Sequence, residues 1–379
     1  MNEKEKLEEL LRKVLQDPLS FTDAEFETAI ELGLGFDHLR TLVKEIYDIN
    51  ENDLIRISSP TQGVLGKWNK KSSDKREKRY GDKVDKQIEG KEYYRIYAEG
   101  DSWFQFPVFI KDIIDWLDDK DDLLIASDAY GGDWITNILY DGQYISGLSN
   151  YAPDYFLISG GGNDIVGSYK IAMLVAENPI YQIKKYKNPQ EIKSVNLDLT
   201  DEEKQTIFHG HKFLNKEFYA LIMVFKLQYT LLFRHLYKDN NKHKHVVSIT
   251  QGYDYPIPDN KRRFSVKTPL QPVVNSLLDT GKWLYTPLMI KKIMNRGNQQ
   301  SILFTMIYEF NEMMAGFALK FDKVYHVDSR GLAKNQSDWY DELHLKPKNF
   351  KIVAKAYEHI IRNHKNGNVN KIVRSGDFS

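Results

Sequence analysis

From residue 93 onward, short apolar segments alternate with segments whose apolar residues recur at helical spacing. The short segments are rich in β-branched and aromatic residues and predict strands at 94–99, 122–127, 155–159, 246–250 and 324–327. The helical spacing predicts helices over 104–117, 133–139 and 347–361, the last of which begins suitably with Pro347. Such an alternation predicts an α/β fold in which helices cover both faces of a parallel sheet.

Other segments lie outside this alternation. Residues 1–48 predict two helices, which form a small N-terminal extension over 1–50. Residues 165–243 and 256–321 interrupt the α/β domain (93–367) as two mainly helical insertions. The segment 217–237 is apolar on most faces, which predicts a helix that is well buried or covers a cleft. A short tail, 368–379, follows the domain.

Charge divides the first ninety residues into two parts. Residues 1–48 hold 12 acidic and 6 basic residues, whereas 67–91 hold 10 Lys or Arg, 5 Asp or Glu, and few apolar residues. This pattern predicts a solvated basic linker over 51–92. A second interpretation is a basic arm that docks on the acidic helices or on an external polyanion.

Composition excludes several classes of protein. The 379 residues include 53 Lys or Arg, 53 Asp or Glu and no cysteine. Disulfides, thiolate nucleophiles and Cys-based metal sites are therefore excluded, and no overall charge draws the protein to nucleic acid. Residues 1–20 lack the apolar segment of a secretory signal, and the longest apolar run, Phe218–Phe225, is eight residues. We expect a cytoplasmic protein without a membrane span; signal-less export and the oligomeric state stay open.

Polar and small residues follow the predicted strands. In an open parallel sheet, ligands bind beyond the carboxyl ends of the strands, so these residues are candidates for a common site. The segments are Gly100-Asp101-Ser102-Trp103, Tyr130-Gly131-Gly132-Asp133, Gly160-Gly161-Gly162-Asn163-Asp164, Gln251-Gly252-Tyr253-Asp254, Asp328 with Arg330, and Asp341-Glu342-Leu343-His344.

These residues include the groups that acyl transfer requires. A serine hydroxyl such as that of Ser102 is a weak nucleophile until a base, here His344, removes its proton. Asp341, three residues before His344, is the candidate to orient the imidazole, and Asp338 and Glu342 are alternatives.

The negative charge that develops on the carbonyl oxygen needs fixed hydrogen-bond donors. The backbone N–H groups of Ser102 and Gly132 and the side-chain amide of Asn163 are the candidates. Gly131 is the alternative to Gly132.

The order of these motifs resembles that of the SGNH (GDSL-type) hydrolase superfamily of serine esterases and lipases. Gly100-Asp101-Ser102 matches its first block, Gly132 the second, Gly161-Gly162-Asn163-Asp164 the third, and Asp341-x-x-His344 the fifth. The matches run in family order over residues 100–344. Trp103 departs from the leucine or threonine that often follows the nucleophile.

The resemblance implies a flavodoxin-like three-layer α/β/α sandwich with a five-stranded parallel sheet of order 2-1-3-4-5. It also implies hydrolysis of a carboxylic ester through an acyl-enzyme, without metal or cofactor. By the same resemblance, Ser102 is the nucleophile, His344 the base and Asp341 the orienting acid, while Gly132 and Asn163 donate to the oxyanion.

The substrate is less defined by the sequence. Trp103, Tyr130, Tyr253 and Asp254 are the candidates to line the substrate pocket, and the insertions are candidates for a lid. The ester of a small molecule, lipid or carbohydrate fits equally. The alternative function is a non-catalytic binding or scaffold protein that uses residues 1–91 for partner contacts.

Two other kinds of site find little support. The pairs His209/His211 and His243/His245 have no carboxylate at a convincing spacing, so we expect no metal site. The three glycines 160–162 are not part of a Gly-x-x-x-x-Gly-Lys-Ser/Thr pattern and do not predict a phosphate site.

Overall fold

The computed structural model describes residues 2–58, 63–106, 110–182, 185–259 and 283–379. Its centre is one parallel sheet of six strands in the order β2-β1-β3-β4-β5-β6. The strands are β1 (Tyr94–Gly100), β2 (Leu123–Ser127), β3 (Tyr155–Ser159), β4 (Val247–Gln251), β5 (Val324–Asp328) and β6 (Ile372–Arg374). The predicted α/β class and the order of the first five strands are confirmed.

The sixth strand corrects the prediction of a tail over 368–379. In β6, Ile372 and Val373 pair with His326 and Val327 of β5. Three residues are too few to show the alternation by which a strand is recognised in a sequence.

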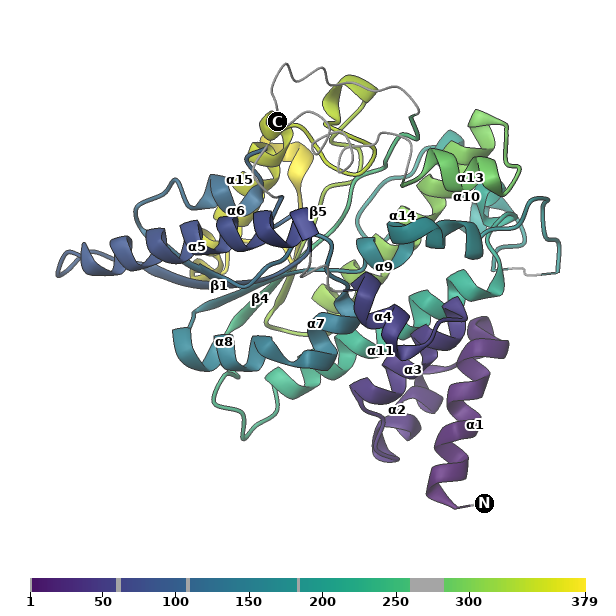
Figure 1. Ribbon diagram of the computed structural model, residues 1–379, viewed down its shortest axis with the longest axis horizontal. Helices are drawn as coiled ribbons and strands as arrows, with labels where there is room; N and C mark the ends of the chain where they lie inside the picture. The colour runs from purple at the N-terminus through teal and green to yellow at the C-terminus, as the bar shows by residue number, and fades with distance from the viewer. Residues whose placement is uncertain (1, 59–62, 107–109, 183–184, 260–282) are drawn as a thin grey trace.

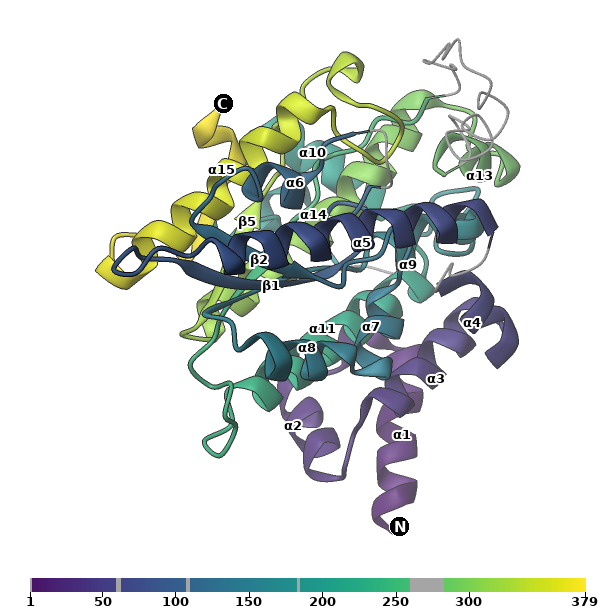
Figure 2. The same ribbon diagram turned by 60° about the vertical axis from the view of Figure 1, so that its left-hand side comes forward.

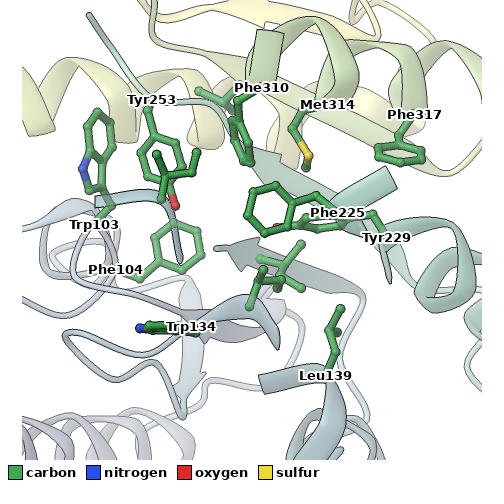
Figure 3. Packing of buried hydrophobic residues seen from close by; sticks show 14 of the residues in the cluster. Trp103, Phe104, Trp134, Leu139, Phe225, Tyr229, Tyr253, Phe310, Met314 and Phe317 are labelled. Atoms are coloured by element: carbon green, nitrogen blue, oxygen red, sulfur yellow. The ribbon is translucent and has the colours of Figure 1, made fainter. Parts of the chain in front are cut away.

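Helices cover both faces of the sheet, as Figures 1 and 2 show. One face carries α5 (Gly63–Asp85), α6 (Ile113–Leu117) and α15 (Pro347–Asn363), and the other carries α7 (Ile135–Asp141), α8 (Gln143–Tyr151), α11 (Lys216–Leu236) and α14 (Arg296–Lys320). Aromatic contacts join α11 to α14, with ring centroids of Phe225 and Phe310 6.0 Å apart. Figure 3 shows this aromatic core continuing to Tyr253 and Trp103 at the edge of the sheet.

The N-terminal extension forms three α-helices instead of the predicted two: α1 (Glu3–Gln16), α2 (Asp23–Glu31) and α3 (Phe36–Tyr47). Gly33 has a φ of 89°, in the left-handed region that favours glycine, and ends α2. The chain therefore turns between α2 and α3, which pack with α1 on the outer side of α7 and α11.

The segment predicted to be a solvated linker folds instead as α4 (Glu51–Ser58) and α5. The inner face of α5 is basic. Arg76 donates to both carboxylate oxygens of Asp112 at 2.7 and 2.6 Å, and Arg79 and Lys83 pair with Asp118 at 2.8 Å each. Hydrophobic periodicity does not predict this helix, because ion pairs, and not a stripe of apolar residues, hold its buried face. The basic residues dock on α6 and not on the acidic N-terminal helices.

Two further predictions need correction. Of the helix expected over 104–117, the described residues 104–106 and 110–117 form only α6, because the Asp112 side chain accepts a hydrogen bond from the Asp115 N–H and caps the helix there. The insertion 165–243 contains α10 (Asp201–His211) and the buried α11, but residues 174–182, 185–188 and 192–200 have little regular structure. In the second insertion, α13 (Tyr285–Ile290) precedes α14, and 260–282 lie outside the described residues.

The prediction that 217–237 is a buried helix is confirmed, since α11 has buried residues on all its faces. None of the helices within the described ranges combines the length and apolar character needed to cross a membrane.

Candidate active site

The predicted motifs meet at the carboxyl edge of the sheet. Ser102 follows β1, Gly132 follows β2 and Asn163 lies at the start of the short helix α9 (Gly162–Val166) after β3. Asp341 and His344 follow β5 in a turn that ends where α15 begins. A backbone bridge between Trp339 and Leu345 closes this turn, so segments far apart in the sequence converge on one site.

Ser102, His344 and Asp341 form a continuous chain of hydrogen bonds. Ser102 Oγ lies 2.7 Å from His344 Nε2, and His344 Nδ1 lies 2.8 Å from Asp341 Oδ2. Asp341 Oδ1 also accepts the backbone N–H groups of Leu343 and His344 at 2.7 and 2.8 Å. The carboxylate thus fixes both the ring and the backbone that carries it. His344 and Asp341 are buried and Ser102 is half-buried, so Ser102 is the most accessible of the three side chains.

The surroundings of Asp341 favour the ionised form of its carboxyl. Burial acts to raise the pKa of its carboxyl, but the charge of His344 and the hydrogen bonds that the carboxylate accepts outweigh burial and hold the pKa below its ordinary value. Asp341 is therefore ionised at neutral pH, in a position from which a carboxylate can orient the His344 ring and stabilise a positive charge on it.

The two alternative acids have other contacts. Asp338 pairs with Lys348 at 2.9 Å on the surface. The Glu342 carboxylate accepts four backbone N–H groups, at 2.9 to 3.2 Å, from Asp259, Trp283, Leu284 and Tyr285. Neither carboxylate contacts His344 within the described structure.

The loop after β2 distinguishes Gly132 from Gly131. The Gly131 N–H donates to Asn69 Oδ1 and its carbonyl accepts from Asn69 Nδ2, both at 3.0 Å. Gly132 has a φ of 94°, and its N–H has no hydrogen-bond partner among the described residues. Gly132, and not Gly131, therefore keeps a backbone donor free for a substrate oxygen.

The Asn163 side chain is held by the same loop. Its Nδ2 donates to the carbonyl of Asp133 at 3.1 Å. Because an amide nitrogen carries two hydrogens, one donor remains for a substrate oxygen. Asn163 lines a pocket together with Ser102.

Two motif aspartates are structural supports. The Asp101 carboxylate accepts the Trp103 N–H at 3.0 Å, Ser159 Oγ at 2.8 Å and the Tyr253 hydroxyl, which ties the serine loop to β3 and β4. The Asp164 carboxylate accepts the Ile135 N–H at 2.9 Å at the start of α7. Burial, opposed by these hydrogen bonds, raises the pKa of both carboxyls, that of Asp164 to about 6.

The predicted substrate residues separate into two groups. Trp103, Tyr253 and Asp254 line the pocket beside Ser102. Tyr130 does not: its hydroxyl donates to the carbonyl of Gly66 in α5 at 3.2 Å, and it borders a different hollow. An aromatic residue after a strand can turn to either side of its loop, and here the partner comes from α5, in the segment that the sequence predicts to be a linker.

The sequence does not predict several contacts around the site. Asn69 and Arg76 of α5 reach the loops after β2 and β1, and Arg76 Nη1 donates to the carbonyl of Phe104 at 2.6 Å. The pocket is also lined by Ile165 of α9 and by Leu303 and Met306 of α14. In the sequence these residues appear as ordinary helix positions, so no local signal marks them.

The histidine pairs contact neutral groups. His209 Nε2 lies 2.9 Å from Asn298 Oδ1, His211 contacts the Tyr219 hydroxyl, and His243 Nε2 lies 3.3 Å from Ser149 Oγ. Within the described ranges, no three His, Asp or Glu residues gather so that they could hold a metal ion.

No protein-family model matches the chain, and no curated protein or solved structure matches it either. An account of its function therefore depends on the geometry of the site and on the chemistry that this geometry permits.

Proposed function

We propose that the protein is a serine hydrolase that cleaves a carboxylic ester through an acyl-enzyme. The observation that carries this proposal is the hydrogen-bond chain from Ser102 Oγ through His344 to the buried Asp341. A nucleophile, a base and an orienting acid in this order are the arrangement that activates a serine hydroxyl.

The reaction has two halves. In the first, His344 Nε2 takes the proton of Ser102 Oγ as this oxygen attacks the ester carbonyl carbon. The oxyanion that forms accepts hydrogen bonds from the N–H groups of Ser102 and Gly132 and from the Asn163 amide. The intermediate collapses when His344 gives its proton to the leaving alcohol.

In the second half, water attacks the acyl group on Ser102. His344 takes a proton from this water and returns it to Ser102 Oγ, which releases the carboxylic acid. Asp341 keeps the imidazole oriented throughout, because it holds Nδ1 and the backbone of the same residue.

Turnover of a p-nitrophenyl ester tests the proposal. Ser102→Ala should abolish turnover with the fold retained by circular dichroism. Ser149→Ala is the matched control, because Ser149 lies exposed on α8, away from the site. Equal activity of wild-type protein and Ser102→Ala would contradict the proposal.

The alternative of a scaffold protein that uses residues 1–91 stays a prediction without a specific observation in its favour. In the structure, α3 contacts α7 and α11, and α5 contacts β2. These helices therefore have a role within the fold itself.

A further inference from the structure

A pocket opens directly beside the nucleophile. Ser102 and Asn163 line it together with residues of two helices: α9 contributes Ile165 and Val166, and α14 contributes apolar side chains. The α14 residues that line it are Leu303, Met306 and Ile307. The cavity volume is about 50 Å³, so the site admits a narrow chain and not a bulky group.

The polar groups in the lining are already bonded. The Asp254 carboxylate accepts the N–H groups of Tyr255, Gly331 and Ala333 at 2.8, 2.7 and 2.6 Å. The carboxylate of Asp101 and the hydroxyl of Tyr253 bond each other.

The indole N–H of Trp103 is also used, since it donates to the carbonyl of Leu343 at 3.1 Å. Beyond Asn163, the described side chains of the lining therefore offer no unbonded donor or acceptor for a sugar hydroxyl or a charged group. An apolar ligand part is the one that such a surface favours.

The position of His344 identifies which part of the ester, the acyl chain or the alcohol, enters the pocket. His344 must protonate the leaving alcohol, so the alcohol part lies beside its ring. The pocket is lined by Ser102 and Asn163 but not by His344. The group that extends from the carbonyl carbon into the pocket is therefore the acyl chain.

We infer that the space between α9 and α14 is the acyl-chain site, and that the substrates are esters of linear aliphatic acids longer than acetate. This inference rests on the proposed function. Each methylene that leaves water for the pocket should raise kcat/KM by about fourfold until the site is filled.

Substitutions on the two walls test the site. Ile307→Trp on α14 and Val166→Trp on α9 each replace a half-buried lining residue with a large ring. The two positions lie on different helices, so one variant can be measured if the other does not fold. Both should lower the ratio of kcat/KM for the hexanoyl p-nitrophenyl ester to that for the acetyl ester by at least about tenfold. Leu319→Trp, exposed on the same α14, is the control and should leave the ratio unchanged.

Ligand binding tests the site independently of turnover. Octanoate should bind Ser102→Ala more tightly than acetate in a calorimetric titration, and the double variant Ser102→Ala/Val166→Trp should lose this difference. Serine-dependent turnover with a flat chain-length profile would overturn the inference and leave the esterase proposal intact. Absence of turnover with every ester would contradict the esterase proposal, and octanoate binding no tighter than acetate binding would still overturn the acyl site.

Discussion

The side chain of Asn69 forms two hydrogen bonds of 3.0 Å with the backbone of Gly131, one to its N–H and one to its carbonyl. Asn69 lies on α5 and is fully buried, and Gly131 directly precedes the proposed oxyanion donor Gly132. A helix that the sequence presents as a linker thus fixes the loop on which catalysis would depend.

Removal of this contact should affect the chemical step. Asn69→Ala should lower kcat by roughly tenfold to a hundredfold with little change in KM, because a displaced Gly132 N–H weakens binding of the oxyanion but not of the ground state. Steady-state kinetics well below the melting temperature measure the effect. Lys70→Ala, at the exposed neighbouring position, is the control. An unchanged kcat in folded Asn69→Ala would show that α5 does not position the loop.

Asn163→Ala tests the side-chain donor itself. Loss of one oxyanion donor lowers kcat by about 10²–10³, and we expect a loss in this range with KM nearly constant. The comparison variant is Asn298→Ala, whose amide lies on the exposed surface with His209. If Asn163→Ala raised KM and left kcat unchanged, Asn163 would bind substrate and would not stabilise the transition state.

The ion pair between Arg76 and Asp112 predicts a large change in stability. Both side chains are buried, with exposures of 4% and 0%. Arg76→Met leaves the Asp112 charge without its partner and should lower the free energy of unfolding by about 3–5 kcal/mol, as measured by urea denaturation. The exposed Lys75→Met should change it by less than about 0.5 kcal/mol.

A second variant separates charge from packing in this pair. Asp112→Asn added to Arg76→Met removes the uncompensated charge, so it should recover part of the lost stability. A double variant as unstable as the sum of the two single variants would show that the two residues do not interact.

Asp328 predicts how stability changes in acid. Burial acts to raise the pKa of this carboxyl, but the charge of Arg330 and its hydrogen bonds outweigh burial and hold the pKa below the ordinary value. A carboxyl with a lower pKa in the folded state adds stability above its unfolded pKa and loses it as the pH falls through the folded pKa. Asp328→Asn should therefore lose less stability than the wild type when the pH falls below about 5.

Thermal unfolding at a series of pH values measures this difference. Asp201→Asn, at a position 99% exposed, is the control and should follow the wild-type curve. Parallel curves for Asp328→Asn and wild type would mean that another group accounts for the acid sensitivity.

The sequence predicted those parts of the fold and site that short segments encode. The five apolar strands were recognisable locally, and the Ser102, Gly132, Asn163 and His344 motifs each lie in one loop. Once the strands form a parallel sheet, these loops meet at one edge. The relative positions of the four motifs then follow from the order of the strands in the sheet.

The parts that were missed depend on contacts between distant segments. Helix α5 buries Arg76 and Asn69 in place of an apolar stripe, so hydrophobic periodicity did not reveal it. The pocket walls on α9 and α14 are about 140 residues apart in the chain, and no spacing records that Ile165 and Met306 face the same space. Tyr130 was misplaced for the same reason, because its partner Gly66 belongs to α5.

Covalent labelling measures the central claim most directly. An alkyl fluorophosphonate reacts with an activated serine, and the modified peptide can be identified by mass spectrometry. The account predicts one adduct, on Ser102, which forms far more slowly in folded His344→Ala, because Ser102 Oγ then lacks its base. An adduct on another residue, or a folded protein that acquires none, would contradict the proposal that Ser102 is the nucleophile of a hydrolase.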